Sequence, residues 1–451
     1  MSFEKPIFDY AKLQEDLCRK NDIIPNDAYE TYNVKRGLRD INGDGVPAGL
    51  TNISYITASR KENGVRIPQD GQLYYRGYNI MDLVKRYSKN RFGYENLAYL
   101  LIFGELPDEQ QLQDFLEAMS LSRHLPSNFV RDVIMKAPGH DIMNSMTRSI
   151  LTLASYDPYA QKTDLPNVIR QSLMLIAVFP MLAIYGYHAY NHYDNLGSMY
   201  IHRPDHSLST AENTLRMLRP DQQYTPVEAA VLDAAFMLHM EHGGGNNSTF
   251  TTHVVTSSGS DTYATIAAAM SSLKGPKHGG ANLKVIDMMK DIKENVTDCS
   301  DDEALDRYLT QMLDGEVFDH QGLIYGMGHA IYSVSDPRER VFHSFVRKLS
   351  EEKGRSRDMD LYEKVQEIAP KVISRKRRMY KGVSANVDFY SGFVYEMLGI
   401  PKELFTPIFS IARIAGWSAH RIEELANASK IIRPAYKYVG CHRDYVDLTS
   451  R

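Results

Sequence analysis

The chain has 451 residues, a formal net charge of −4 and a hydrophobic share of 43%. This length exceeds the usual size of a single domain, so we expect two domains around one large core. The small negative charge gives no general attraction to nucleic acid or to an anionic membrane, which disfavours both as partners.

Cysteine usage indicates the compartment. Cys18, Cys299 and Cys441 lie far apart in the sequence and are odd in number. No disulfide framework follows from this pattern, so we expect a reducing, cytoplasmic location. Residues 1–6 resemble neither a secretory signal nor an arginine-rich transit peptide.

Strand signals are few and lie near the start of the chain. Residues 1–36 are polar, and we expect them to be irregular. Residues 53–56 and 73–75 then predict two short strands. The remainder has the apolar spacing of helices, so the expected fold class is all-α.

Helix signals recur from residue 112 onward. Apolar residues at helical spacing mark residues 112–119, and residues 283–390 form a charge-rich helical stretch. Capping-box sequences open helices at residues 209–212 and 225–228. We expect the second of these helices to extend to His242.

The longest apolar run covers residues 173–185 and contains Pro180. A bilayer requires about 20 apolar residues, so this run is too short to span one. We therefore expect no membrane segment here, and a helix buried in the core or in a subunit interface.

The most informative polar motif surrounds His278, which lies between a Gly-Pro turn and a double glycine. Helical spacing begins at Val285, so a helix should start within a few residues of the imidazole. The positive end of that helix would lower the histidine pKa and keep the ring neutral. A neutral ring can donate a hydrogen bond to a developing enolate, although a loop histidine beside a glycine turn explains the motif equally well.

Three further clusters follow downstream. They are Gly326-Met327-Gly328-His329 with Asp336-Pro337-Arg338, then Asn386-Val387-Asp388-Phe389, then Arg413 among apolar residues of a predicted helix. A buried arginine needs an anionic partner, either from the protein or from a ligand. Each cluster alone also fits an ordinary structural role, which for Asp388 is a helix cap.

In this order, the motifs resemble the citrate synthase family. Residues 238–242, 246–249 and 73–78 add to the match, which runs from about residue 37 to the C-terminus. The resemblance implies a two-domain helical fold in which a large domain carries an inserted small domain. The implied boundaries are 1–36 for an N-terminal extension of unknown role, 37–279 with 392–451 for the large domain, and 280–391 for the small domain. Gly279-Gly280 and Ser391-Gly392 are the expected flexible joints.

The resemblance also implies a reaction, the condensation of acetyl-CoA with oxaloacetate followed by hydrolysis of the thioester. Asp388 matches the base that removes the methyl proton, and its apolar neighbours would raise its pKa. His278 matches the donor to the thioester carbonyl, and His329 matches the residue that polarises the ketone. The coenzyme A thioester is then a substrate, and no bound cofactor or metal is expected.

Arg338, Arg413 and Arg433 match the three carboxylate clamps of the family, and His242 matches a further oxaloacetate contact. The planar fork of arginine meets a carboxylate with two parallel hydrogen bonds. Arg433 corresponds to the clamp that reaches in from the other subunit. A homodimer or larger oligomer, with Arg433 acting in trans, is therefore expected.

The chain departs from the commonest family pattern directly after His242. Gly243-Gly244-Gly245 stands where many members have a glutamate and fewer residues, which puts the helper role of Asn246 in doubt. The pair His239 and His242 also has a spacing that metal sites use, but no third ligand is evident.

A basic run at residues 374–381 has three interpretations: a solvated helix face, a nuclear signal, or a phosphate-binding edge for coenzyme A. Its position shortly before Asp388 favours the last. The residues expected to contact the coenzyme are Gly326, Gly328, Arg375, Lys376 and Lys381.

The nearest alternative activity is 2-methylcitrate synthesis from propionyl-CoA. One extra methyl group in an apolar pocket changes the free energy by only about 1–3 kcal/mol, so the motifs serve either substrate. A catalytically silent CoA-binding homologue and a nucleic-acid binder built on the basic run are the less favoured alternatives.

Overall fold

The computed structural model describes residues 5–39, 45–63, 65–329, 331–377, 382–427 and 430–450. These residues form two compact units. One comprises Met1–Ala48 and Arg433–Arg451, and the other comprises Gly49–Ile432.

The smaller unit contains two helices, α1 (Lys5–Asp22) and α2 (Asn26–Thr31), and short 3-10 turns at Arg36–Leu38 and Leu448–Ser450. The prediction that residues 1–36 are irregular is therefore wrong. Part of the reason is local, because Arg19 donates to Glu15 one turn earlier at 3.0 Å. The Lys437 ammonium lies 5.6 Å from the centre of the Tyr32 ring, which links the two segments of this unit.

The larger unit begins with an antiparallel sheet of β1 (Ser54–Glu62), β2 (Val65–Tyr75) and β3 (Tyr78–Asn79), in the order β1-β2-β3. Both predicted strands exist and are longer than expected. The hairpin is irregular between Thr57 and Ser59, where the register shifts. β2 ends at the buried Tyr75, whose hydroxyl donates to the carbonyls of Met237 and Glu241.

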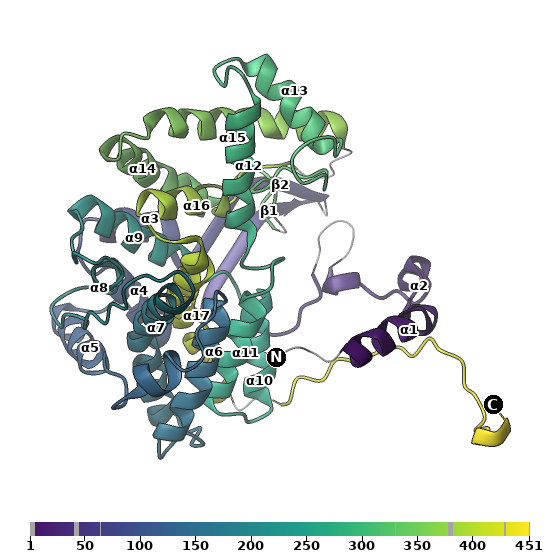
Figure 1. Cartoon of the computed structure of the whole chain (residues 1–451), viewed down its shortest axis with the longest axis horizontal. Helices are drawn as coiled ribbons and strands as arrows, with labels where there is room; N and C mark the ends of the chain where they lie inside the picture. Colours follow the sequence, from purple (N-terminus) through teal and green to yellow (C-terminus); the bar gives the residue numbers. More distant parts are fainter. Residues whose placement is uncertain are drawn as a thin grey trace. The chain divides into compact units, whose positions relative to one another are not determined.

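α17 (Phe405–Ala426) is the central helix of this unit and contacts α4, α6, α7, α9, α10 and α11 of the first group. Figure 1 shows it passing between them. The helices of this group are α3 (Ile80–Tyr87), α4 (Gly93–Phe103), α5 (Glu109–Leu121), α6 (Ile142–Leu153), α7 (Leu165–Asp194), α8 (Thr210–Leu218), α9 (Pro226–His239), α10 (Asn247–Ser257) and α11 (Thr262–Leu273). A π-helical turn at Val130–Ile134 and 3-10 turns at Ala154–Tyr156 and Lys402–Leu404 complete it.

A second group of helices lies at the top of Figure 1. Its members are α12 (Ala281–Asn295), α13 (Asp302–Leu313), α14 (Pro337–Glu352), α15 (Ser356–Lys376) and α16 (Asp388–Met397). α14 contacts α9, α3 and β2, so it joins this group to the first. The all-α expectation holds, with the small sheet as the exception.

The two predicted capping boxes are confirmed at α8 and α9. Thr225 accepts from the backbone of Glu228, and the Glu228 carboxylate accepts from the backbone of Thr225. α9 nevertheless ends at His239, so the prediction that it reaches His242 is wrong. The Tyr75 hydroxyl binds two carbonyls at this end of the helix, and three glycines follow His242.

α7 is 30 residues long, well beyond the apolar run that predicted it. Its length and composition would allow it to cross a membrane, but 78% of its most apolar 18-residue window is buried inside the protein. Packing against neighbouring helices accounts for this hydrophobicity, so the prediction of a buried helix is confirmed.

The expected joint at Ser391-Gly392 lies inside α16 and is therefore wrong as a flexible link. A Cβ on Gly392 would lie 2.8 Å from the Asn282 carbonyl oxygen and 2.8 Å from Ile286 Cγ1. Glycine is needed here because α16 and α12 pack closely. The predicted small domain lies within the larger unit, and so does the predicted large domain apart from residues 37–48 and 433–451. The boundaries at 280 and 391 stay a prediction.

Candidate active site

The larger unit brings together residues from six places in the sequence. His242 follows α9, His278 lies in the turn between α11 and α12, His329 lies in the loop before α14, Arg338 lies in the first turn of α14, Asp388 opens α16, and Arg413 lies in the middle of α17. The predicted helix next to His278 is confirmed, because α12 begins at Ala281.

Aromatic contacts join His242 to the loop that carries His329. The two imidazole centroids lie 5.0 Å apart, nearly perpendicular, and His329 stacks on Tyr332 with centroids 4.8 Å apart. The Arg338 guanidinium carbon lies 5.8 Å from the centre of the same Tyr332 ring. Tyr332 thus fixes three predicted site residues relative to one another.

The loop after His329 determines its tautomer. Nδ1 accepts hydrogen bonds from the backbone N–H groups of Ile331 and Tyr332, at 3.1 and 3.2 Å. An accepting Nδ1 has no proton, so the neutral ring carries its proton on Nε2. His329 is therefore oriented to donate from Nε2.

A short antiparallel bridge links the His329 loop to the Asp388 loop. Gly328 N–H donates to Ser384 O, and Asn386 N–H donates to Gly326 O, around a pairing of Met327 with Ala385. The Asn386 side chain strengthens this link. Its amide donates to Gly328 O at 2.9 Å, and its carbonyl accepts from Asp388 N–H at 3.0 Å.

Asp388 has the electrostatic environment of a base that works near neutral pH. Burial raises its pKa to about 6, and the charge of Asp336 adds to this effect. The positive charges of Arg338 and Arg413 oppose it. Removal from water dominates, as its apolar neighbours in the sequence predict.

His278 is held by a hydroxyl. Its Nε2 lies 3.1 Å from Ser248 Oγ, which also accepts from Trp417 Nε1 at 3.1 Å. Burial lowers the His278 pKa to about 4, and the charge of Arg413 contributes to the shift. The ring is neutral, as predicted, and burial and an arginine both favour the neutral form.

His239 and His242 are also neutral, because burial lowers both pKa values well below the usual range, and nearby arginines add to the effect. Both ring nitrogens of His239 and Nε2 of His242 are buried without a protein hydrogen-bond partner. Among the described residues, no cluster of three or more His, Cys, Asp and Glu side chains is arranged to hold a metal ion.

Arg338 already has a carboxylate partner that the sequence analysis did not assign. Its Nε and Nη2 donate to the two Asp336 oxygens at 3.1 and 2.7 Å. Burial has the largest single effect and would lower the Arg338 pKa, but the charge and hydrogen bonds of Asp336, together with Tyr332 and Asp388, raise it. Asp336 is the N-cap of α14, so the local turn pre-orients this arginine.

Arg413 has the opposite character. It is 1% exposed, its Nε donates to the His239 carbonyl, and its Nη1 is buried without a partner. Burial lowers its pKa to about 10, against the opposing charge of Glu241. A buried cation with an unused donor is a site for an anion.

Arg433 is exposed and begins the C-terminal segment of the smaller unit, so its place at this site stays a prediction. Of the predicted coenzyme contacts, Arg375 pairs with Asp306 and Lys376 pairs with Asp314, both at 2.7 Å or less. Lys381 lies outside the described residues. These ion pairs give Arg375 and Lys376 a structural role between α15 and α13.

The two glycines predicted to approach the coenzyme differ. Gly326 has φ +76°, and a Cβ there would lie 2.8 Å from Phe389 Cδ2, so packing requires it. Gly328 has φ +83° and no described atom within 4 Å of an added Cβ. Only Gly328 leaves room for a ligand next to its backbone.

Comparison with known proteins identifies the family and the fold. Residues 41–435 match the family described as citrate synthase, C-terminal domain. The citrate synthase of Synechocystis sp. is 34% identical over 414 residues, which cover 90% of this chain and 92% of that protein. The chain belongs to the citrate synthase family.

Other relatives carry two activities. The citrate synthase of Haloferax volcanii is 32% identical, covering 90% of this chain and 96% of its own. The 2-methylcitrate synthase 1 of Corynebacterium glutamicum is 30% identical, covering 93% and 98%. As a member of this family, the protein is an enzyme that transfers an acyl group.

Solved citrate synthases share the fold. The enzyme from Pyrobaculum aerophilum has a TM-score of 0.71 at 28% identity, covering 90% of this chain and 94% of that chain. A ternary complex of carboxymethyl coenzyme A and oxaloacetate with citrate synthase from Thermoplasma acidophilum has a TM-score of 0.73 at 25% identity, covering 92% and 98%. The predicted helical citrate synthase fold is confirmed.

Several residues of this citrate synthase family site were quoted in motifs but given no role, among them Ser248, Trp417, Asp336 and Asn386. Their partners are distant in sequence or depend on a turn, so spacing alone does not reveal them. Asp336 is the exception, because an aspartate directly before Pro337 is a sequence signal for a helix N-cap.

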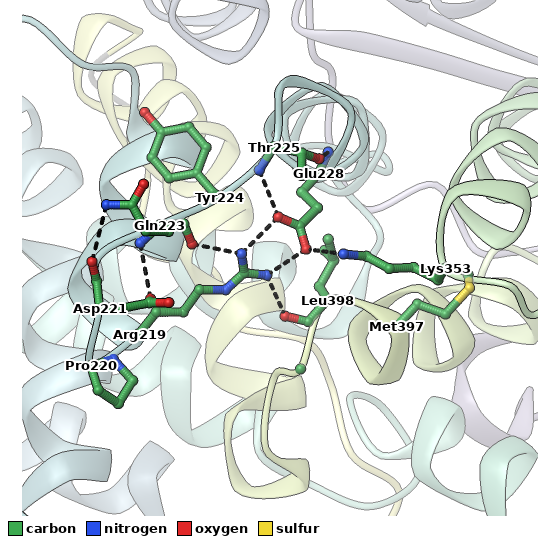
Figure 2. A pocket seen from close by; sticks show the side chains of 11 residues that line it. Arg219, Pro220, Asp221, Gln223, Tyr224, Thr225, Glu228, Lys353, Met397 and Leu398 are labelled. Atoms are coloured by element: carbon green, nitrogen blue, oxygen red, sulfur yellow. Dashed lines mark hydrogen bonds and ion pairs between the residues drawn. The ribbon is translucent and has the colours of Figure 1, made fainter.

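Away from these residues, a cavity of about 720 Å³ lies where the start of α9 meets the ends of α14 and α16. Figure 2 shows the Glu228 carboxylate between Arg219 and Lys353. Arg219 also donates to Leu398 O at 2.8 Å. Arg219 and Lys353 are thus both paired with Glu228. We therefore assign this cavity to the contact between these helices and not to the reaction.

Proposed function

We propose that this protein is a citrate synthase, which condenses acetyl-CoA with oxaloacetate and water to give citrate and CoA. The observation that carries the proposal is one carboxylate with a raised pKa, Asp388, whose loop pairs with the His329 loop, together with two histidines able to donate, His278 and His329. A carbon acid needs such a base together with donors for the oxygen that becomes negative.

Oxaloacetate carries two carboxylates, so its site needs cations or N–H donors that are still available to a ligand. Arg413 offers a buried, unpaired Nη1, and His242 offers a buried, unpaired Nε2. Arg338 is charged but shares its fork with Asp336, so it would bind through its remaining N–H groups. Arg433 of a second subunit is the proposed third clamp.

The proton movements follow from the tautomers. Asp388 removes a proton from the methyl carbon of the acetyl group, and His278 stabilises the enolate oxygen with an N–H. The enolate carbon attacks the ketone of oxaloacetate, and the His329 Nε2 proton passes to the new alkoxide. Water then cleaves the citryl thioester, which releases CoA.

Ser248 is the residue that would orient His278. Its single hydroxyl hydrogen has two acceptors within reach, Asn246 Oδ1 at 2.9 Å and His278 Nε2 at 3.1 Å. When the hydroxyl points to His278, the ring proton lies on Nδ1, which makes Nδ1 the donor to the substrate. Asn246 would act on His278 indirectly, because its Oδ1 competes with His278 Nε2 for the Ser248 hydroxyl hydrogen.

Relatives of both activities match this chain at about the same identity, 30–34%, so the acyl group is decided by an assay. We propose acetyl-CoA, with propionyl-CoA and 2-methylcitrate as the second candidate. Thiol release is measured from each thioester, with and without oxaloacetate. A higher kcat/KM for propionyl-CoA reverses the choice, and no release from either contradicts both and favours a silent CoA-binding homologue.

Further features of the proposal concern the assembly and its surroundings. We propose a homodimer or larger oligomer with no bound cofactor, in which coenzyme A thioester enters as substrate. Gly328 supports coenzyme binding because its backbone is open on one side. The free thiols of Cys18, Cys299 and Cys441 support a reducing, cytoplasmic location.

A further inference from the structure

Four titratable side chains form a chain of short contacts next to the His242 turn. Glu424 Oε2 lies 2.6 Å from His253 Nδ1, and His253 Nε2 lies 3.0 Å from His420 Nδ1. His420 Nε2 then lies 3.1 Å from Glu241 Oε1. α10 and α17 supply the first three residues, and Glu241 directly precedes His242.

The geometry of this chain separates two hydrogen bonds from one contact between charges. Glu424–His253 and His253–His420 are hydrogen bonds, and the two protons of two neutral imidazoles satisfy both. The contact of His420 Nε2 with Glu241 Oε1 at 3.1 Å is not a hydrogen bond, and a neutral ring would place an unprotonated nitrogen against a buried carboxylate there. A third proton on the pair of rings removes this repulsion and gives an imidazolium between two carboxylates.

The two rings differ in the charges and the burial around them. Burial lowers the pKa of His253, and the neighbouring His420 charge lowers it further, against the opposing effect of Glu424. His420 is fully buried, and its Nε2 faces Glu241 at ion-pair distance outside good hydrogen-bond geometry. That contact stabilises through charge, which only a protonated ring carries. Glu423, whose Oε2 lies 4.0 Å from His420 Nδ1, adds negative charge to the same side.

Glu241 connects this chain to the oxaloacetate site. It is fully buried, and its Oε1 accepts from Ser54 Oγ at 2.8 Å and from Gly243 N–H at 2.5 Å. These two bonds fix the residues on either side of His242. Burial alone would raise the Glu241 pKa, yet His420 and Arg413 lower it to about 2, so the carboxylate is charged.

We propose that His253 and His420 share one proton between Glu424 and Glu241, and that this buried imidazolium keeps Glu241 in place as the positioning residue for His242 and Arg413. The inference rests on the proposed oxaloacetate site for its consequence, but the shared proton is independent of it. Arg76, whose pKa also responds to Glu423 and Glu241, is a further cation near this cluster besides Arg413.

The shared proton is tested by nitrogen NMR of the full-length enzyme labelled with 15N-histidine, between pH 6 and 9. The expected result is one doubly protonated ring at pH 7.5 that His420→Gln and His253→Gln each remove. The exposed His206, replaced as His206→Gln, is the matched control and should leave that signal unchanged. Two neutral rings across this pH range would overturn the proton assignment.

The positioning role is tested with Glu241→Gln, which keeps the shape of the side chain and removes its charge. We expect the imidazolium signal to disappear and the KM for oxaloacetate to rise roughly tenfold or more, as for loss of a buried charge-assisted contact. kcat should change much less, because Glu241 does not touch the reacting atoms. Unchanged oxaloacetate affinity in a folded Glu241→Gln protein would overturn the role.

A second variant keeps the test decisive if Glu241→Gln does not fold. Glu424→Gln alters the outer end of the chain, where the side chain is 12% exposed. It should make the imidazolium lose its proton at lower pH, and the KM for oxaloacetate should rise with that loss. A wild-type protein that releases no thiol would contradict the proposed function alone, since the NMR result does not depend on turnover.

Discussion

Asp388 combines two requirements that oppose each other in free energy. A base must be partly removed from water to have a pKa near neutrality, and the charged form is then unfavourable in the folded state. Its folded pKa of about 6 lies above the ordinary value of 3.8. Folding stability therefore falls as pH rises between these values, because the unfolded chain releases the proton more readily.

Asp388→Ala should lower kcat by about 10²–10⁴-fold while oxaloacetate binding changes little, because the role is in the chemical step. The wild-type kcat should fall as pH drops through about 6, where the base becomes protonated. Steady-state thiol release and calorimetry measure the two effects. Asp82→Ala, at an exposed acid in the first turn of α3, is the control. Activity within a few-fold of wild type would refute the assignment.

At the scale of elements, the N-terminus of α9 shows how local and distant interactions combine. The capping box between Thr225 and Glu228 is local and was predicted from sequence. The same carboxylate also pairs with Arg219 after α8 and with Lys353 after α14, which is 125 residues away (Figure 2). The Glu228 side chain therefore caps the start of α9 and pairs with cations at the C-terminal ends of α8 and α14.

Glu228→Gln should destabilise the protein at pH 7 by about 1–3 kcal/mol, because two partly buried cations lose their partner. Burial would raise the Glu228 pKa, but Arg219 and Lys353 lower it from 4.5 to about 2. The stabilisation is therefore complete above about pH 4.5 and is lost as pH falls towards 2. Thermal unfolding at pH 7 and pH 3 measures this, with the exposed Glu109→Gln as control. An equal deficit at both pH values would contradict the ion-pair explanation.

At the scale of the whole molecule, the site draws on both helix groups of the larger unit. Arg413 and His242 belong to the first group, whereas His329, Arg338 and Asp388 lie in or beside the second. α14 is in contact with both groups. A change in their separation would therefore assemble or separate the clamps and the base.

Oxaloacetate should accordingly bind first and complete the acetyl-CoA site, because closure excludes water from the enolate. Calorimetry with an unreactive acetyl-CoA analogue measures its affinity with and without oxaloacetate. We expect clearly tighter binding when oxaloacetate is present. Equal affinity in both conditions would count against ordered binding.

Arg433 should act in trans. Two inactive variants, Asp388→Ala and Arg433→Ala, are mixed under conditions in which subunits exchange. Each mixed dimer then has one site with both intact residues, so activity should return. If Arg433 serves its own chain, every site keeps one lesion and the mixture stays inactive. Inactivity despite proven exchange and correct folding of both variants would sink this prediction.

The sequence by itself determined the helical fold and the family, and it predicted which residues would form the candidate site. Capping boxes and apolar spacing act over a few residues, so Thr225 and Glu228 predict a helix start that the structure confirms. Where interactions are distant, sequence failed. α9 stops at His239, close to the Met237 carbonyl that the Tyr75 hydroxyl binds from β2, and Gly392 is a packing contact rather than a joint.

Only the tertiary structure decided the environment of each site residue. Local sequence attributed the neutral His278 to a helix end, and the fold adds burial and the charge of Arg413, which no local pattern indicates. The pairing of Arg338 with Asp336 is local, whereas the chain from Glu424 to Glu241 crosses α10 and α17. A pKa depends on water excluded and charges gathered from the whole fold, and neither quantity is encoded at one place in the sequence.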